Sequence, residues 1–194
     1  MNNDLELPEE FRAGYNPLNP PLENWVAEIA GALVGQSKSI CDSPEFSKAL
    51  GLESNLADGL RSKIHWELLI YLLFWHARVI VANRKDDSRP LLDRLYYCLG
   101  KKVTSDDKTF LDEITARFES YHTALENQAG AGPMYWLGKA AFENIAGTRE
   151  WSFDVLGGGI YLNLLGVEVA KAVKKLLPGS PSLISRILSV FQSR

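Results

Sequence analysis

The segment HWELLIYLLFWHAR, residues 65–78, carries two histidines, a glutamate and an arginine within a long apolar run. Imidazole nitrogens and carboxylate oxygens bind metals and transfer protons, so these side chains are the first candidates for chemistry. At about 100° per residue, His65 and His76 share one helix face, and Glu67 and Arg78 share the opposite face. Eleven residues separate the members of each pair, which is roughly 16 Å along a helix. Neither pair can therefore hold one metal or form one ion pair, and any site needs partners from another helix.

Apolar residues surround these polar groups on every side of the helix, which predicts a central helix over about 56–84, packed on all faces. A buried glutamate requires a cation or hydrogen-bond donors. Two interpretations of Glu67 follow. In the structural one, it pairs with an arginine or a tyrosine of a neighbouring helix. In the functional one, it lies in a polar pocket with Tyr71, His76 and Arg78, and with His122 from the next long helix.

A metal site is only weakly indicated by the sequence. Glu119-Ser-Tyr-His122 matches the Glu-x-x-His element of di-iron helical bundles, but such bundles need two copies, and the sequence has one. The apolar stripe of residues 106–128 also places Glu119 on the far side of its helix, so a solvent-facing or partner-facing Glu119 is expected. Glu67, Glu119 and His122 are the weak metal candidates; no metal is predicted, and any cofactor is unknown.

The glycine triplet Gly157-Gly158-Gly159 does not have the pattern of a phosphate-binding loop. It lacks the Lys-Ser/Thr of a P-loop and a preceding strand. A turn between helices and a close helix–helix contact are the two remaining interpretations, and Gly166, near the same face as Gly159, suits the second. No Gly-x-Ser-x-Gly motif is present either, so the sequence predicts no catalytic constellation.

The fold class follows from recurrent helix starts and stops. Prolines and capping residues open segments, glycines close them, and strand signals are nearly absent. The first helix is expected to end at about Gly35, and another at Gly100. We predict one all-α domain, a bundle of about seven or eight helices around the central helix. Its parts would be an extended arm (1–19), the bundle (20–179) and a C-terminal amphipathic segment (180–194).

The C-terminal segment LISRILSVFQ follows the proline-rich stretch PGSPS. A helix this short is not stable alone, so we expect it to dock on its own domain, on a second copy or on a partner protein. The candidate interface is its apolar face, made by Leu183, Ile184, Ile187, Leu188 and Phe191.

A second amphipathic region, upstream of the C-terminal segment, could contact a membrane. The run VLGGGIYLNLLGVEVA (155–170) has 16 residues, fewer than the roughly 20 needed to span a bilayer. Downstream, Lys171, Lys174 and Lys175 share a polar face that could meet an anionic membrane surface. A surface helix with lysines near its C-terminus has the same pattern, because they complement the helix dipole.

Composition sets the remaining expectations. The chain has 194 residues, a net charge of −3 and two cysteines, as in a soluble globular protein that does not bind nucleic acid. The cysteines lack metal-binding spacing, and the acidic N-terminus lacks a secretory pattern, so the cytoplasm is expected. Our leading hypothesis is a non-enzymatic bundle that acts by protein–protein association, with itself or a partner. The alternative is an enzyme or a ligand or metal binder with a Glu/His pocket around the central helix.

Overall fold

The computed structural model describes residues 18, 20–52, 58–84, 88–103, 107–127, 132–146 and 153–177. Within these ranges the chain forms seven helices and no strand, which confirms the predicted all-α fold. The helices are α2 (Pro20–Cys41), α3 (Pro44–Ala49), α4 (Asp58–Asn83), α5 (Ser88–Val103), α6 (Asp107–Glu126), α7 (Pro133–Ala146) and α8 (Phe153–Leu176).

Two of the three predicted parts, the N-terminal arm and the C-terminal segment, lie almost wholly outside the described residues. Of the predicted N-terminal arm only Leu18 is described, and it packs against the core. The C-terminal segment 180–194, with all of its candidate interface residues, lies outside the described residues.

Local sequence signals explain most of the helix boundaries. α2 and α7 begin at the prolines expected to open them, Pro20 and Pro133. The Ser43 side chain caps α3 by accepting a hydrogen bond from the Phe46 backbone N–H at 3.2 Å. After α3 the backbone turns through Gly51, whose φ of 61° is easily adopted only by glycine.

Two helices extend beyond their predicted ends. α2 was expected to stop near Gly35 but continues to Cys41. Gly35 faces open space, where its cost in a helix is about 1 kcal/mol, and the next turns bury Ser37 and Cys41. α5 likewise continues past Gly100 to Val103, which packs against the core. In both helices the burial of later residues outweighs the helix-breaking tendency of glycine.

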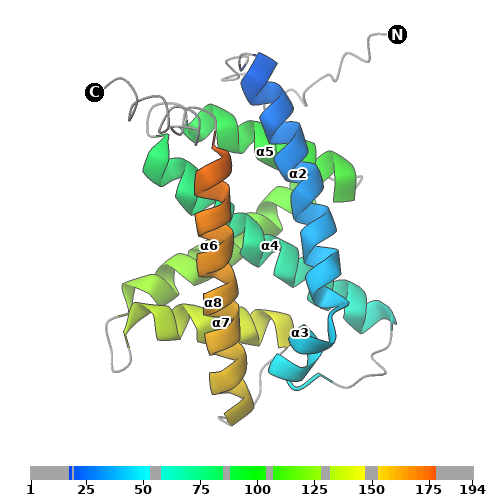
Figure 1. Ribbon diagram of the computed structural model, residues 1–194, viewed down its shortest axis with the longest axis vertical. Coiled ribbons are helices and arrows are strands. Elements are labelled where there is room, and N and C mark those ends of the chain that lie inside the picture. The colour runs from blue at the N-terminus through cyan, green and yellow to red at the C-terminus, as the bar shows by residue number, and fades with distance from the viewer. Residues whose placement is uncertain are drawn as a thin grey trace, which may run out of the picture.

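α4 is the central helix, as predicted. Every residue from Glu67 to Ile80 is buried except Arg78. α2, α5, α6, α7 and α8 all pack against it, and in Figure 1 it passes behind α8 through the middle of the molecule. Polar side chains on α4 must therefore find partners on these neighbouring helices.

α8 is held against its neighbours by the glycines that the sequence singled out. A Cβ atom at Gly158 would lie 2.4 Å from the Phe142 ring, and one at Gly166 would lie 2.0 Å from Nε1 of Trp75. Gly159 meets Gly138 of α7, where a Cβ on Gly138 would lie 2.5 Å from the Gly159 carbonyl oxygen. The triplet lies inside a helix and not in a turn; Gly158 and Gly159 pack closely against other helices, whereas a Cβ at Gly157 would meet nothing within 4 Å.

Among the described residues, two helices are long and apolar enough to cross a membrane, judged by length and composition alone. They are Gly59–Asn83 in α4 and Leu156–Leu176 in α8. Their surroundings differ, because 78% of the most apolar stretch of α4 is buried inside the protein and only 28% of that of α8. α4 thus has the burial of a core helix, whereas much of α8 is uncovered.

Candidate functional site

Glu67 is paired with Arg117 of α6. The arginine donates two hydrogen bonds, from Nε to Oε2 at 2.7 Å and from Nη2 to Oε1 at 2.6 Å. The Glu67 side chain is 4% exposed and that of Arg117 is 37% exposed. The hydrogen bond to Glu67 is the main cause that raises the pKa of Arg117. This two-point pair gives Glu67 the arginine partner of the structural interpretation.

Tyr71 and Trp75 lie on the side of α4 that faces α8. The Tyr71 hydroxyl is buried and donates a hydrogen bond to the Leu162 carbonyl oxygen at 2.9 Å. Its ring packs edge-on against Trp75 and against Tyr121 of α6. Burial raises the pKa of Tyr71 well above its usual value of 10, so the group remains a hydrogen-bond donor joining α4 to α8.

His76 is buried on the side of α4 toward α2. Its Nδ1 lies 2.8 Å from the Leu72 carbonyl oxygen. A carbonyl oxygen only accepts a hydrogen bond, so Nδ1 carries a proton. Burial lowers the pKa of His76 to about 4, partly opposed by this hydrogen bond. His76 is therefore neutral near pH 7, and it lines a groove between α2 and α8 together with Gln36 and Glu168.

Replacing His76 with asparagine should remove one pH dependence of stability. Unfolded histidine binds a proton below pH 6.5, whereas folded His76 does so only below about pH 4. As the pH falls through this window, the unfolded state alone gains a proton, so the free energy of unfolding falls by about 3 kcal/mol. Asparagine does not titrate, and Asn83 already makes the same bond to the Val79 carbonyl at 2.7 Å on this helix.

Urea denaturation of both proteins at pH 7 and pH 4.5 measures this difference. Between these two pH values the wild type should lose roughly 2–3 kcal/mol more than the asparagine variant. Equal losses in the two proteins would show that His76 titrates as freely when folded as when unfolded.

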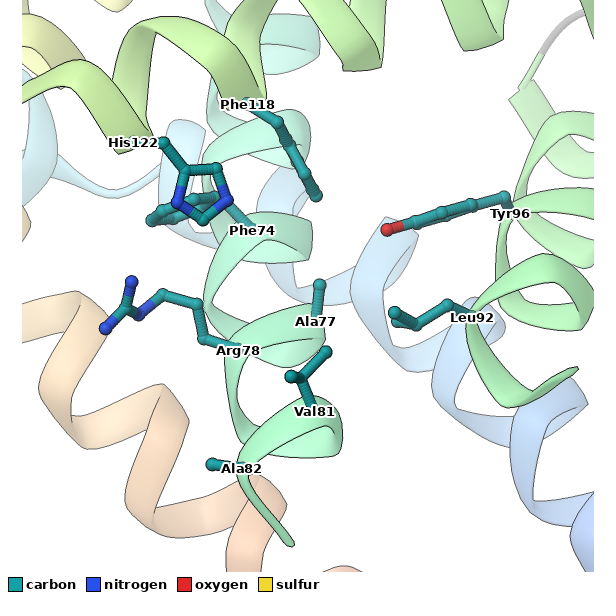
Figure 2. A pocket seen from close by; sticks show the side chains of 9 residues that line it. All are labelled: Phe74, Ala77, Arg78, Val81, Ala82, Leu92, Tyr96, Phe118 and His122. Carbon is teal, nitrogen blue, oxygen red and sulfur yellow. The ribbon is translucent and has the colours of Figure 1, made fainter. Parts of the chain in front are cut away.

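Arg78 and His122, two of the five candidate pocket residues, line one cavity of about 340 Å³. It lies between α4, α5 and α6 (Figure 2). We call it the α4–α5–α6 pocket; its lining residues are Phe74, Ala77, Arg78, Val81, Ala82, Leu92, Tyr96, Phe118 and His122. Glu67, Tyr71 and His76 do not line it. The structure thus brings α4 and α6 side by side, as a pocket there requires, but directs the Glu67 side chain elsewhere.

Sequence reasoning missed the aromatic side chains that build this pocket. The Phe74 ring contacts both Phe118 and His122 at 5.2 Å between centroids, and Tyr96 lies 6.3 Å from Phe118. Leu92 and Tyr96 stand four residues apart on α5. That spacing was the available signal, because such residues share a helix face.

Arg117 was also missed as a named residue. It stands three residues after Ile114 and four before Tyr121, and both of these are buried. It therefore borders the apolar stripe of α6, which was the sequence signal for a partly buried arginine.

The described residues give the metal hypothesis no group of ligands. Among the residues that the structure describes, no group of three or more His, Cys, Asp and Glu side chains could hold a metal ion. The three weak metal candidates also lie in different environments. Glu67 is bound by Arg117, Glu119 is exposed, and the His122 ring packs against Phe74.

The second candidate surface is the exposed outer face of α8, which lies beside α7 at Ile160 and beside α2 at Glu168. We define the α8 outer face by Gly157, Ile160, Leu164, Glu168 and Lys171, all exposed and spaced three or four residues apart. Ile160 is 53% exposed and Leu164 is 62% exposed. Beyond them, Glu168 accepts a hydrogen bond from Lys171 at 2.7 Å. The face thus has an apolar half and a charged half.

Comparisons of this chain with protein-family models, with curated proteins and with solved structures find no match. The fold defines its class as an all-α bundle, and the two surfaces above carry the functional argument.

Proposed function

We propose that this protein acts by associating with a second copy of itself through the α8 outer face. The observation that carries the proposal is the contrast between two apolar helices. In α4, 78% of the most apolar stretch is buried within the molecule, whereas in α8 only 28% is buried and Ile160 and Leu164 are exposed. Uncovered apolar surface is a source of free energy for association.

The close packing of α8 against its neighbours prevents the helix from rotating to bury its outer face. Its inner side fits α4 at Gly166, where a Cβ would lie 2.0 Å from Nε1 of Trp75, and fits α7 at Gly159, where a Cβ would lie 3.2 Å from the Gly138 carbonyl carbon. Rotation of the helix would bring side chains into these contacts. Ile160 and Leu164 therefore stay directed outward, one helical turn apart, and no other part of the described chain covers them.

A second copy is the partner because such a face suits two-fold symmetry. Across a two-fold axis each subunit presents the same patch, so an apolar pair meets an apolar pair. A stable dimer buries roughly 800 Å² on each subunit, so neighbouring residues must contribute. Met134 is 41% exposed, and its carbonyl accepts a hydrogen bond from Asn163, which places the start of α7 beside this face.

Sedimentation equilibrium of the full chain over a range of concentrations tests the proposal. The wild type should show a reversible rise from monomer to dimer mass. Ile160→Lys combined with Leu164→Lys should raise the dissociation constant at least tenfold, because two charges replace apolar contacts. Leu60→Lys is the matched control, since Leu60 is 47% exposed on α4 and should leave association unchanged. A wild type that stays monomeric, or equal effects of both changes, would contradict the proposal.

An anionic membrane is the competing partner, because Lys171, Lys174 and Lys175 are exposed at the end of α8. Flotation with phosphatidylserine vesicles separates the two. Vesicle binding that salt abolishes, in a protein that remains monomeric, would replace the proposal.

The proposal also places the protein in a reducing compartment such as the cytoplasm. Cys41 and Cys98 are both free thiols, which supports that location. The net charge of −3 favours a protein partner over nucleic acid.

A further inference from the structure

The α4–α5–α6 pocket is a separate site from the α8 outer face. Its volume of about 340 Å³ lies within the range of roughly 300–1,000 Å³ typical of small-molecule sites. At about 30 Å³ per water molecule, the space is equivalent to about eleven waters. A molecule with about ten non-hydrogen atoms would fill it.

Most of the pocket wall is apolar. Phe74 and Ala77 form its buried floor, and Val81, which is 50% exposed, stands at its edge. Phe118 and Leu92 come from the neighbouring helices (Figure 2). A ligand that displaces water from these side chains gains free energy through its own apolar body.

The cationic group of the pocket is Arg78. It is the exposed residue in an otherwise buried stretch of α4. Its guanidinium lies 5.7 Å from the centroid of the Phe74 ring, and among the described residues no carboxylate pairs with it. An arginine beside an apolar cavity, without a counter-ion, is suited to bind a carboxylate.

The other polar groups orient a ligand along the pocket. In Figure 2, His122 lies on the same side as Arg78, and Tyr96 directs its hydroxyl across from the opposite side. Burial, and next the Asp93 carboxylate, raise the pKa of Tyr96 above 10. At the Tyr96 end of the pocket, the hydroxyl is therefore neutral and the Asp93 carboxylate is near. Both features disfavour the binding of an anion at that end. Glu119 and Glu126, near His122 on α6, are exposed and do not line the pocket.

We propose that the α4–α5–α6 pocket binds a small apolar monocarboxylate, with its carboxylate at Arg78 and His122 and its apolar body between Val81, Leu92 and Tyr96. The size, the apolar wall and the one-sided positive charge each limit the ligand independently. The proposed interaction is reversible and non-covalent, and it includes no chemical reaction.

Isothermal titration calorimetry of the full chain with octanoate, which has about ten non-hydrogen atoms, is the test. We expect a dissociation constant of roughly 0.1–1 mM for a ligand of this size. Octanamide, the neutral molecule of the same shape, should bind at least tenfold more weakly. Equal affinity for the two, or no octanoate binding in the millimolar range, would overturn the proposal.

Variants locate the binding within the molecule. Arg78→Gln should weaken octanoate at least tenfold and leave octanamide unchanged, because only the charged ligand uses the guanidinium. Arg61→Gln is the control: it makes the same charge change on α4, at an exposed residue paired with Asp42, and should not alter binding. Val81→Trp should block both ligands by filling the pocket from its exposed edge. Octanoate binding that survives both Arg78→Gln and Val81→Trp would place the ligand elsewhere.

Discussion

Replacing Arg117 with methionine is expected to lower the free energy of unfolding by about 3 kcal/mol. The change leaves the Glu67 carboxylate, whose side chain is 4% exposed, without its bound cation. Removing one partner of a buried pair costs about 3–5 kcal/mol, and we expect the lower end because the Arg117 side chain is 37% exposed. Chemical denaturation at pH 7 measures the loss.

Two further variants show whether the unpaired charge is the cause. Glu67→Leu combined with Arg117→Met removes both charges and should restore most of the stability, because well-packed apolar residues can replace a buried pair. Arg117→Lys keeps the charge without the two-point geometry and should fall between wild type and Arg117→Met. A double variant less stable than Arg117→Met would contradict this account of the pair.

Gly138→Ala is expected to destabilise the protein by about 1–3 kcal/mol, the usual cost of overpacking. The new Cβ would lie 2.5 Å from the Gly159 carbonyl oxygen. That atom belongs to the backbone of α8 and cannot rotate away, so α7 and α8 must move apart. The loss should exceed the gain of about 1 kcal/mol that alanine normally brings to a helix interior.

Gly157→Ala is the matched control for this prediction. Gly157 lies in α8, two residues from Gly159, and a Cβ there meets nothing within 4 Å. Within one subunit only the helix propensity changes, so at concentrations where the protein is monomeric the midpoint of thermal unfolding should rise. Opposite signs for the two alanine variants would support the close crossing of α7 and α8. A stabilising Gly138→Ala would show that the two backbones do not approach this closely.

Much of the fold could be predicted because its signals are local. Prolines and capping residues mark where α2, α3 and α7 begin, and the apolar run of α4 predicts its burial on all faces. The ends of α2 and α5 could not be predicted this way. Gly35 and Gly100 resemble stop signals, and only the tertiary burial of the residues that follow them shows why the helices continue.

The candidate site could be predicted only in part, because spacing within one helix does not show which helix faces it. Glu67 was identified as needing a partner, and the sequence allowed an arginine, but Arg117 is 50 residues away in the chain. Arg78 and His122 were grouped together, and they do share a pocket. Tyr96 reaches that pocket from α5, and its contribution depends on how α5 packs, which periodicity does not determine.

The two proposed sites use different parts of the molecule. The α8 outer face lies on a helix that contributes no residue to the α4–α5–α6 pocket. A variant in one site should therefore leave the other intact, since independent sites behave additively. Octanoate binding by the Ile160→Lys/Leu164→Lys variant provides that check.

Hydrogen–deuterium exchange of the full chain at low and high protein concentration tests the central claim, self-association through α8, most directly. We predict that peptides covering residues 156–171 gain protection at high concentration, because association suppresses local opening of the helix that is covered. Peptides from residues 64–80 of α4, already buried, should not change, and the Ile160→Lys/Leu164→Lys variant should show no gain. Protection that rises elsewhere, or nowhere on α8, would contradict the account.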